Sequence, residues 1–194
     1  MIVLASKSAS RQAMLSAAGV DFTARPADID ERALEAELAG AAADAVAVQL
    51  AEAKARAISA QDGSALVLGS DSLVVVEGRR FDKPASRGDA AEHLRFFSGK
   101  VMELHSAAAL VRADALLWSH AAVARLHVVD MSEAFIESYL AAEWPAVAGC
   151  VGVFRIEARG VQLFRAIDGD HFTVLGMPLL PLLGALRDLE ELPQ

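Results

Sequence analysis

Several acidic and basic side chains stand where they could act on a charged substrate, and Asp71 is the first of these. It follows the strongly apolar run 65–68, which predicts a central strand. An aspartate at the carboxyl end of such a strand often serves α/β enzymes as a general base or as a metal ligand. The alternative for 69–72 is a β-bulge or a turn, because Gly, Ser and Asp are turn-forming residues. Asp71 is therefore a candidate catalytic residue, and both roles stay open.

A second candidate is the segment 6–11, Ser-Lys-Ser-Ala-Ser-Arg, which separates an expected strand from an expected helix. Small hydroxyl residues let the backbone approach a ligand closely. Free amides at the start of a helix, together with Arg11, would form an anion site. The alternative is a helix capped by serine whose Arg11 points to solvent, and the local pattern alone favours this alternative.

The acidic loop 26–31 is a third candidate, since Asp28, Asp30 and Glu31 offer hard oxygen ligands of the kind that Mg²⁺ prefers. Taken alone, it is better interpreted as a solvated loop. Lysines are scarce: Lys54 lies on an expected helix and Lys83 precedes a proline. Each has an ordinary alternative, as a solvent-facing helix residue and as a loop charge.

Length, charge and cysteine usage exclude several classes of protein. The chain has 194 residues and a formal net charge of −8, which argues against coating nucleic acid through its phosphates. The single cysteine, Cys150, excludes an internal disulfide, and we interpret it as a buried structural thiol. No signal peptide or membrane-spanning segment is predicted, so we expect a cytoplasmic protein. The spacing of the histidines makes a zinc site unfavourable.

The elements that must position these residues alternate between strand and helix, with several hairpins. This pattern predicts an α/β fold with a mixed sheet and flanking helices, and nothing divides 1–194 into separately folding domains. Asp44, Ser86 and Ser132 are expected to cap helices. The expected strands are 1–5, 22–24, 65–68, 73–76, 79–81, 102–111, 116–129, 154–156 and 163–167, and the expected helices are 11–18, 44–60, 86–98, 132–142 and one after Pro178.

Seven segments, taken in order, resemble the Maf family of nucleoside triphosphate pyrophosphatases. Each motif is weak alone, but their order and spacing together are specific, and they span nearly the whole chain. The segments are LASKSASR (4–11), DIDE (28–31), AEAKARA (51–57), GSDSLVVVEGRRFDKP (69–84), FSGK (97–100), AGCVGVFRIEARG (148–160) and IDGDHFTVLGMPL (167–179).

The resemblance implies hydrolysis of a nucleoside triphosphate between its α and β phosphates, with Mg²⁺ or Mn²⁺ as the divalent metal. It implies an elongated α/β structure, here one domain of two lobes around a central deep cleft, and a homodimer. From the acidic charge and the absence of a long apolar run, we expect no nucleic-acid or membrane partner. A proposed role of the family is to remove non-standard nucleotides, and some members are linked to division arrest.

The resemblance also assigns roles to residues of this chain. Asp71 matches the family's proposed proton acceptor, and Glu31 matches an acidic residue of the metal site, which Asp71 would share. A triphosphate concentrates negative charge, which basic side chains and a metal neutralise. The residues that match polar and basic positions lining the triphosphate site are Ser8, Arg11, Lys54 and Lys83.

Three positions bear on the choice of nucleotide: Ser10, Ser72 and Glu157. Glu157 favours the 7-methyl-GTP branch of the family, since a carboxylate can accept hydrogen bonds from N1–H and the amine of a guanine edge. Ser10 stands where that branch has tryptophan and the dTTP/UTP branch has arginine. The alternatives are a dTTP/UTP pyrophosphatase, a house-cleaning enzyme for inosine or xanthosine triphosphate, and a nucleotide-binding division regulator with little catalysis.

Overall fold

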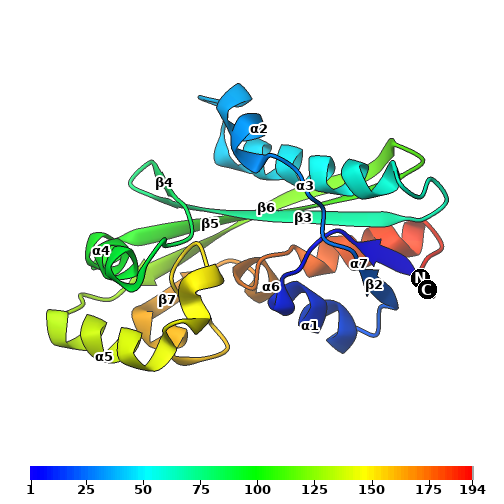
Figure 1. Cartoon of the computed structure of the whole chain (residues 1–194). Helices are drawn as coiled ribbons and strands as arrows, with labels where there is room; N and C mark the ends of the chain where they lie inside the picture. The colour runs from blue at the N-terminus through cyan, green and yellow to red at the C-terminus, as the bar shows by residue number, and fades with distance from the viewer. Residues whose placement is uncertain (194) are drawn as a thin grey trace. The chain divides into compact units, whose positions relative to one another are not determined.

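The computed structural model describes residues 1–193 and contains a seven-stranded mixed sheet with flanking helices (Figure 1). The strand order is β2-β1-β3-β5-β6-β7, and β4 pairs with β3. β1 is parallel to β2 and β3, whereas β4 is antiparallel to β3 and β7 is antiparallel to β6. The predicted fold class is confirmed. The strands are β1 Ile2–Leu4, β2 Phe22–Ala24, β3 Val67–Val76, β4 Arg79–Phe81, β5 Val101–Arg112, β6 Ala115–Val128 and β7 Phe164–Asp168.

Seven α-helices and two short 3₁₀ helices connect these strands within the described residues. No helix among them is both long and apolar enough to cross a membrane. The α-helices are α1 Ala9–Ala17, α2 Glu31–Glu37, α3 Ala43–Ser59, α4 Arg87–Phe97, α5 Glu133–Glu143, α6 His171–Val174 and α7 Leu179–Asp188, and the 3₁₀ helices are Ala146–Gly149 and Arg159–Leu163.

The chain forms two compact units, which are described separately below. Unit 1 consists of Met1–Ser72, His105–Ala122 and the chain from Asp170 onward, and unit 2 consists of Leu73–Leu104 and Val123–Gly169. The expectation of one domain with two lobes around a cleft stays a prediction.

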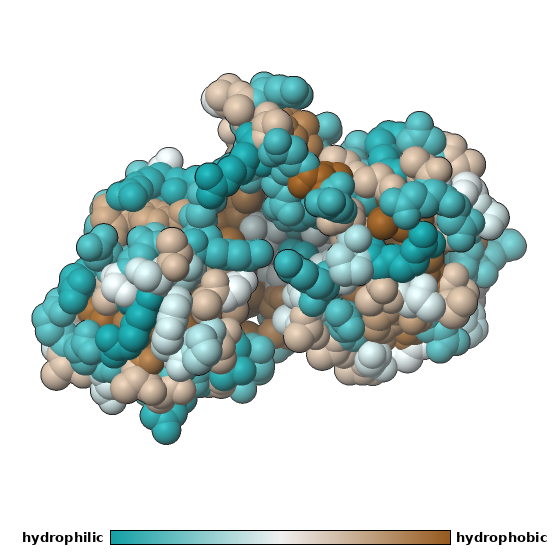
Figure 2. All heavy atoms as spheres, viewed as in Figure 1, coloured by the Kyte–Doolittle hydropathy of each residue, from teal (hydrophilic) through white to brown (hydrophobic). Residues whose placement is uncertain are grey.

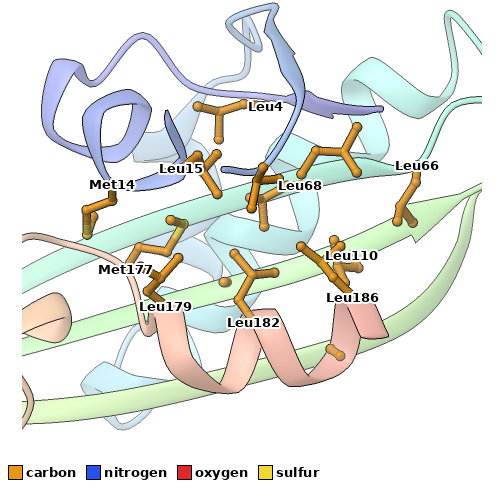
Figure 3. Close-up of a cluster of buried hydrophobic side chains, with 14 residues drawn as sticks. Leu4, Met14, Leu15, Leu66, Leu68, Leu110, Met177, Leu179, Leu182 and Leu186 are labelled. Atoms are coloured by element: carbon orange, nitrogen blue, oxygen red, sulfur yellow. The ribbon is translucent and has the colours of Figure 1, made fainter. Parts of the chain in front are cut away.

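The core of unit 1 covers both faces of β1 and β3. Leu4 and Leu68 point to the side of α1 and α7, where Leu15 and Leu182 are fully buried against them (Figure 3). Val3, the strand neighbour of Leu4, belongs to a separate cluster that includes residues of α3. Successive side chains of a strand point to opposite faces, so a strand that is buried on both faces reads as the continuous apolar run seen in the sequence.

Several boundaries differ from those predicted. The strands expected at 65–68 and 73–76 are one strand, β3, so 69–72 is not a turn. Helix α3 begins after Ala42, with no side-chain cap, and Asp44 lies in its first turn, where a carboxylate is still favourable to the helix dipole. The caps at Ser86 and Ser132 are confirmed.

The strand expected at 154–156 is absent from unit 2. The backbone turns there instead, and Val153 has a positive φ of 57°. Phe154 is 8% exposed and its ring meets that of Phe164 at 4.9 Å, so its apolar character reflects packing of an irregular segment rather than strand pairing.

Two short helices, α2 and α6, were not predicted from the sequence. Helix α2 has no buried residue, and therefore no apolar stripe by which a sequence pattern could find it. At the place that α2 takes in Figure 1, Figure 2 shows hydrophobic and hydrophilic residues side by side. α6 spans only one turn, His171–Val174, and begins at an Asp170 cap.

Candidate active site

Two carboxylates of unit 1 contact the ammonium group of Lys54. Its Nζ lies 2.5 Å from Oδ1 of Asp71 and 3.1 Å from Oε1 of Glu31. The side chains of Lys54 and Asp71 are only 11% and 10% exposed, whereas that of Glu31 is 49% exposed. The structure therefore brings together three of the predicted site residues, from β3, α3 and α2.

The contact of Lys54 with Asp71 depends on how closely α3 lies on β3. A Cβ at Gly69 would stand 1.9 Å from the backbone oxygen of Ala51 and 2.9 Å from the nitrogen of Ala55. Ala51 and Ala55 are completely buried, so small residues on both elements let the backbones approach each other. Because Lys54 and Asp71 each lie within three residues of this contact, a close approach at Gly69 sets the distance between their side chains.

Glu31 is positioned by the start of α2. The Asp30 side chain caps this helix and accepts a hydrogen bond from the nitrogen of Ala33 at 3.0 Å. Glu31 is the first residue of the helix, where a carboxylate is stabilised by the helix dipole. The acidic segment is thus partly a helix start, and not wholly the solvated loop expected.

Arg11 does not point to solvent, and that expectation is wrong. Its Nε donates to the carbonyl oxygen of Gly176 at 2.9 Å, and its Nη1 donates to that of Ser70 at 2.9 Å. Nη1 also donates to Ser6 Oγ at 3.3 Å, and Nη2 donates to Ser72 Oγ at 3.0 Å. Burial lowers the pKa of the guanidinium, while the charges of Asp71 and Glu31 oppose that shift. Arg11 therefore joins α1 to the two residues that flank Asp71.

The serine cap expected at the start of α1 is confirmed. Ser8 Oγ accepts a hydrogen bond from the nitrogen of Arg11 at 3.4 Å. Ser10 Oγ donates to the carbonyl oxygen of Leu175 at 2.9 Å. Ser8 and Ser10 thus lie on the first turn of the helix that carries Arg11, and Ser10 ties that turn to the segment before α7.

A network of buried and partly buried hydroxyl groups continues from Arg11. Ser72 Oγ lies 3.0 Å from Ser106 Oγ and donates to the carbonyl oxygen of Gly176 at 3.0 Å. Ser70 Oγ reaches the same carbonyl at 3.3 Å, and Ser106 Oγ donates to the carbonyl oxygen of Thr173 at 2.9 Å. Buried polar groups require such partners. The network fixes the segment 173–176 against β3, beside Asp71.

Sequence reasoning missed Ser70 and Ser106, which are both completely buried. Their position next to apolar residues in the sequence could have indicated that these hydroxyl groups are buried. Ser106 precedes the apolar run 107–111 within a strand, and a hydroxyl in such a run needs an internal hydrogen bond. The partner itself, Thr173, is 67 residues away and could not be found from local pattern.

Unit 2 holds the other two predicted site residues, Lys83 and Glu157, and both are exposed. Within unit 2, neither makes a hydrogen bond or an ion pair with a described residue. The charges of Lys83 and Glu157 both act on the thiol of Cys150, which is half-buried. Burial raises the pKa of its thiol, the charge of Glu157 raises it further, and Lys83 acts in the opposite direction.

An ion pair with a buried carboxylate lies near the same cysteine. Arg155 Nη2 donates to Oε2 of Glu143 at 2.9 Å, and Glu143 is 5% exposed. Both side chains also act on the thiol of Cys150 through their charges. Four charges act on Cys150, and two of them, Arg155 and Glu143, pair with each other. The other two, Lys83 and Glu157, have no ion pair with a described residue of unit 2.

Glu31 and Asp71 fit a divalent metal of the Mg²⁺ type by the chemistry of their donors. Mg²⁺ commonly uses one or two carboxylates and completes its octahedron with water and substrate phosphates. No group of three or more His, Cys, Asp or Glu side chains within residues 1–193 is arranged to hold a metal. A metal held by Glu31 and Asp71 would therefore gain no third carboxylate, histidine or cysteine ligand from the described residues.

Comparisons with known proteins identify the family of this chain. The sequence profile of the family described as Maf-like protein matches residues 1–189. The chain belongs to this family. The Maf-like chain is 46% identical over 191 residues to a protein of Rhizobium meliloti named 7-methyl-GTP pyrophosphatase, with 97% of this chain and 96% of that protein covered.

A second relative of the Maf-like chain, from Nitrobacter winogradskyi, is named nucleoside triphosphate pyrophosphatase. It is 44% identical over 186 residues, which cover 96% of this chain and 92% of the relative. Among solved structures, a HAM1 protein from Coxiella burnetii aligns over 66% of this chain and 72% of its own, with 19% identity and a TM-score of 0.44. The family predicted from the seven motifs is confirmed.

Proposed function

We propose that this Maf-like protein is a nucleoside triphosphate pyrophosphatase that hydrolyses the bond between the α and β phosphates. The observation that carries the proposal is the contact of the buried Lys54 ammonium with the carboxylates of Asp71 and Glu31. A hydrolase for a triphosphate needs a carboxylate to take a proton from water and cations to neutralise the phosphates. The names of the two relatives support the same reaction.

In the proposed reaction, Asp71 accepts a proton from a water molecule that attacks the α phosphorus. The bond from water oxygen to phosphorus forms, the bond from phosphorus to the bridging oxygen breaks, and pyrophosphate leaves with that oxygen. Lys54 contacts Oδ1 of Asp71, so Oδ2 is the atom that we assign to the proton. A divalent cation, Mg²⁺ or Mn²⁺, held by Glu31 and Asp71 would polarise a phosphate oxygen.

Arg11 and Ser8 belong to the binding side of the proposed site. Arg11 donates four of the five N–H groups of a guanidinium to internal acceptors, so we assign it a mainly positioning role, with its charge acting on the triphosphate. The start of α1, capped by Ser8, offers free amides to a phosphate. From the motif match, we propose Lys83 as a further phosphate ligand.

For the nucleotide, we propose a modified purine, with 7-methyl-GTP favoured. Glu157 supports this choice because a carboxylate accepts hydrogen bonds from the N1–H and amine of a guanine edge and is repelled by the carbonyl oxygens of a thymine edge. Ser72 and Ser10 are the other proposed specificity positions. Their hydroxyl groups donate to Gly176 and Leu175, which makes their influence on the nucleotide an indirect one.

The test is a panel of nucleotides, namely 7-methyl-GTP, GTP, dTTP, UTP, ITP and XTP, each with Mg²⁺, Mn²⁺ or EDTA. Pyrophosphate and the nucleoside monophosphate are the expected products, and EDTA is expected to stop the reaction. Release of orthophosphate would reject the reaction class. Preference for dTTP and UTP would reject only the choice of nucleotide.

A nucleotide-binding regulator with little catalysis is the second candidate, because Ser10 replaces an arginine of the family motif. Tight binding of a nucleotide without turnover under every metal condition would favour it. We also propose a cytoplasmic homodimer. The single cysteine supports the reducing compartment, and light scattering of the purified protein tests the assembly.

A further inference from the structure

Lys54 occupies an unusual electrostatic position. Its ammonium group is the only cation in direct contact with the carboxylates of Glu31 and Asp71 among the described residues, and it touches both. With the charge of Arg11 nearby, the four side chains sum to zero. The carboxylates that would bind a divalent metal are therefore already neutralised by the protein's own side chains.

We propose that Lys54 is an internal counter-cation, which bridges Glu31 and Asp71 in the free protein and leaves them for the triphosphate when a metal-bound nucleotide enters. The proposal rests on the proposed function, because it takes the same two carboxylates as the metal ligands. Lys54 suits this task since its ammonium is a point charge on a flexible four-carbon stem. A bidentate arginine would hold the carboxylates more rigidly.

The surroundings of the bridge make the exchange feasible. Glu31 is half exposed and lies on α2, a helix without any buried residue, so its carboxylate can adjust to a larger coordination shell. Asp71 is held on the buried strand β3 and stays in place. The site then has one fixed carboxylate, one adjustable carboxylate and one cation that can move between them and a phosphate.

The consequence is weak binding of metal alone. In the free protein a divalent cation has to compete with Lys54 for the two carboxylates, and like charges repel at this distance. Once a triphosphate attracts Lys54, both carboxylates become available. Metal and nucleotide therefore favour each other's binding, and Lys54 carries the coupling between them.

The experiment measures binding of Mn²⁺ alone, by electron paramagnetic resonance, to the wild-type protein and to Lys54→Met. The variant is expected to bind Mn²⁺ about tenfold more tightly, a coupling of ordinary size. Lys54→Arg keeps the charge and is expected to stay as weak as the wild type. Lys100→Met, a lysine of unit 2 that pairs with Glu77, is the matched control and should change nothing.

Adding Glu31→Gln to Lys54→Met should remove the gain in affinity, because the gain needs both carboxylates. Equal or weaker Mn²⁺ binding by a folded Lys54→Met would overturn the proposal. Circular dichroism reports whether each variant is folded.

A second measurement uses the wild-type protein and so does not depend on a folded variant. Amine-reactive labelling, read by peptide mass spectrometry, is expected to modify Lys54 slowly, because its side chain is 11% exposed. Saturating Mn²⁺ should accelerate labelling of Lys54 and leave Lys100 unchanged. No effect of Mn²⁺ on Lys54 would contradict the exchange. Neither readout involves turnover, so a protein that hydrolyses no nucleotide can still show the exchange, and an active one can still fail it.

Discussion

The two units differ in how they hold their charged site residues. In unit 1, Glu31, Lys54 and Asp71 contact one another directly, and Arg11 is bonded to four internal acceptors. In unit 2, Lys83 and Glu157 are exposed and act on their surroundings only through their charge. One group is assembled by the fold, and the other has no partner among the described residues of its own unit.

This difference separates two kinds of site residue. Catalysis gains most from groups whose geometry is set before the substrate arrives, since no reorganisation is then needed during the reaction. Groups that select a nucleotide gain their energy from contacts with the ligand itself, and they can stay hydrated until then. We therefore expect substitutions in unit 1 to reduce turnover or stability, and substitutions of Lys83 or Glu157 to change the choice or affinity of nucleotide.

The largest expected effect is that of Asp71→Asn. An amide cannot accept the proton of the attacking water, so kcat should fall by about a hundredfold to ten-thousandfold. The measurement is pyrophosphate release from the preferred nucleotide at saturation. Asp44→Asn, in the exposed first turn of α3, is the control and should keep normal turnover. Full activity of Asp71→Asn would contradict the assignment of catalysis to the charged residues of unit 1.

Gly69→Ala tests whether the fold sets the contact between Lys54 and Asp71. The added methyl group meets the Ala51 oxygen at 1.9 Å and must push α3 away from β3, at a cost of about 3 kcal/mol in the free energy of unfolding. Turnover should fall with it. Gly184→Ala in α7 meets nothing within 4 Å and should be neutral or stabilising by up to about 1 kcal/mol. Thermal and urea unfolding compare the two, and equal stabilities would refute the close approach.

Arg11→Met asks whether Arg11 mainly positions or mainly binds. Four acceptors lose a charged donor, so we expect the free energy of unfolding to drop by about 2 to 3 kcal/mol. Urea unfolding measures it, with the neighbouring, exposed Lys7→Met as control, which should change it by no more than about 0.5 kcal/mol. A stable Arg11→Met that only raises KM would assign Arg11 to the phosphates instead.

The smallest effect concerns the charges of unit 2. Burial and Glu157 raise the pKa of the Cys150 thiol, so its alkylation by iodoacetamide should reach half its maximal rate above the usual thiol pKa of about 8.5. Glu157→Gln should move this midpoint to lower pH and Lys83→Met to higher pH, because the thiolate is the reactive form. If neither substitution shifts this midpoint, the charges of Glu157 and Lys83 do not act on the Cys150 thiol.

The sequence predicted the parts of the fold that repeat a local pattern. The two apolar ends of β3 and the caps at Ser86 and Ser132 follow from apolar runs and hydroxyl spacing, which are local properties. The strand expected around Phe154 was wrong, because an apolar side chain packs equally well in an irregular segment. Helix α2 was missed, since a helix without a buried face has no periodic signal in the sequence.

For the site, residue types were predictable and contacts were not. The carboxylates and lysines follow from the chemistry of a triphosphate, and the motif match added their order along the chain. The role of Arg11 depends on acceptors at Ser70 and Gly176, which lie 59 and 165 residues away. No local rule reaches such separations, and the solvent-facing alternative was the natural expectation without them.

The carbonyl oxygen of Gly176 accepts from three side chains, Arg11, Ser70 and Ser72. During synthesis on the ribosome, the first of these leaves the exit tunnel long before the acceptor has been translated. Until then the guanidinium stays in water, and the segment beside Asp71 lacks its anchor. A nascent chain halted before residue 176 would therefore contain Lys54 and Asp71 but lack the hydrogen bonds to the Gly176 carbonyl. We expect the enzyme to become competent only when its last helix has emerged.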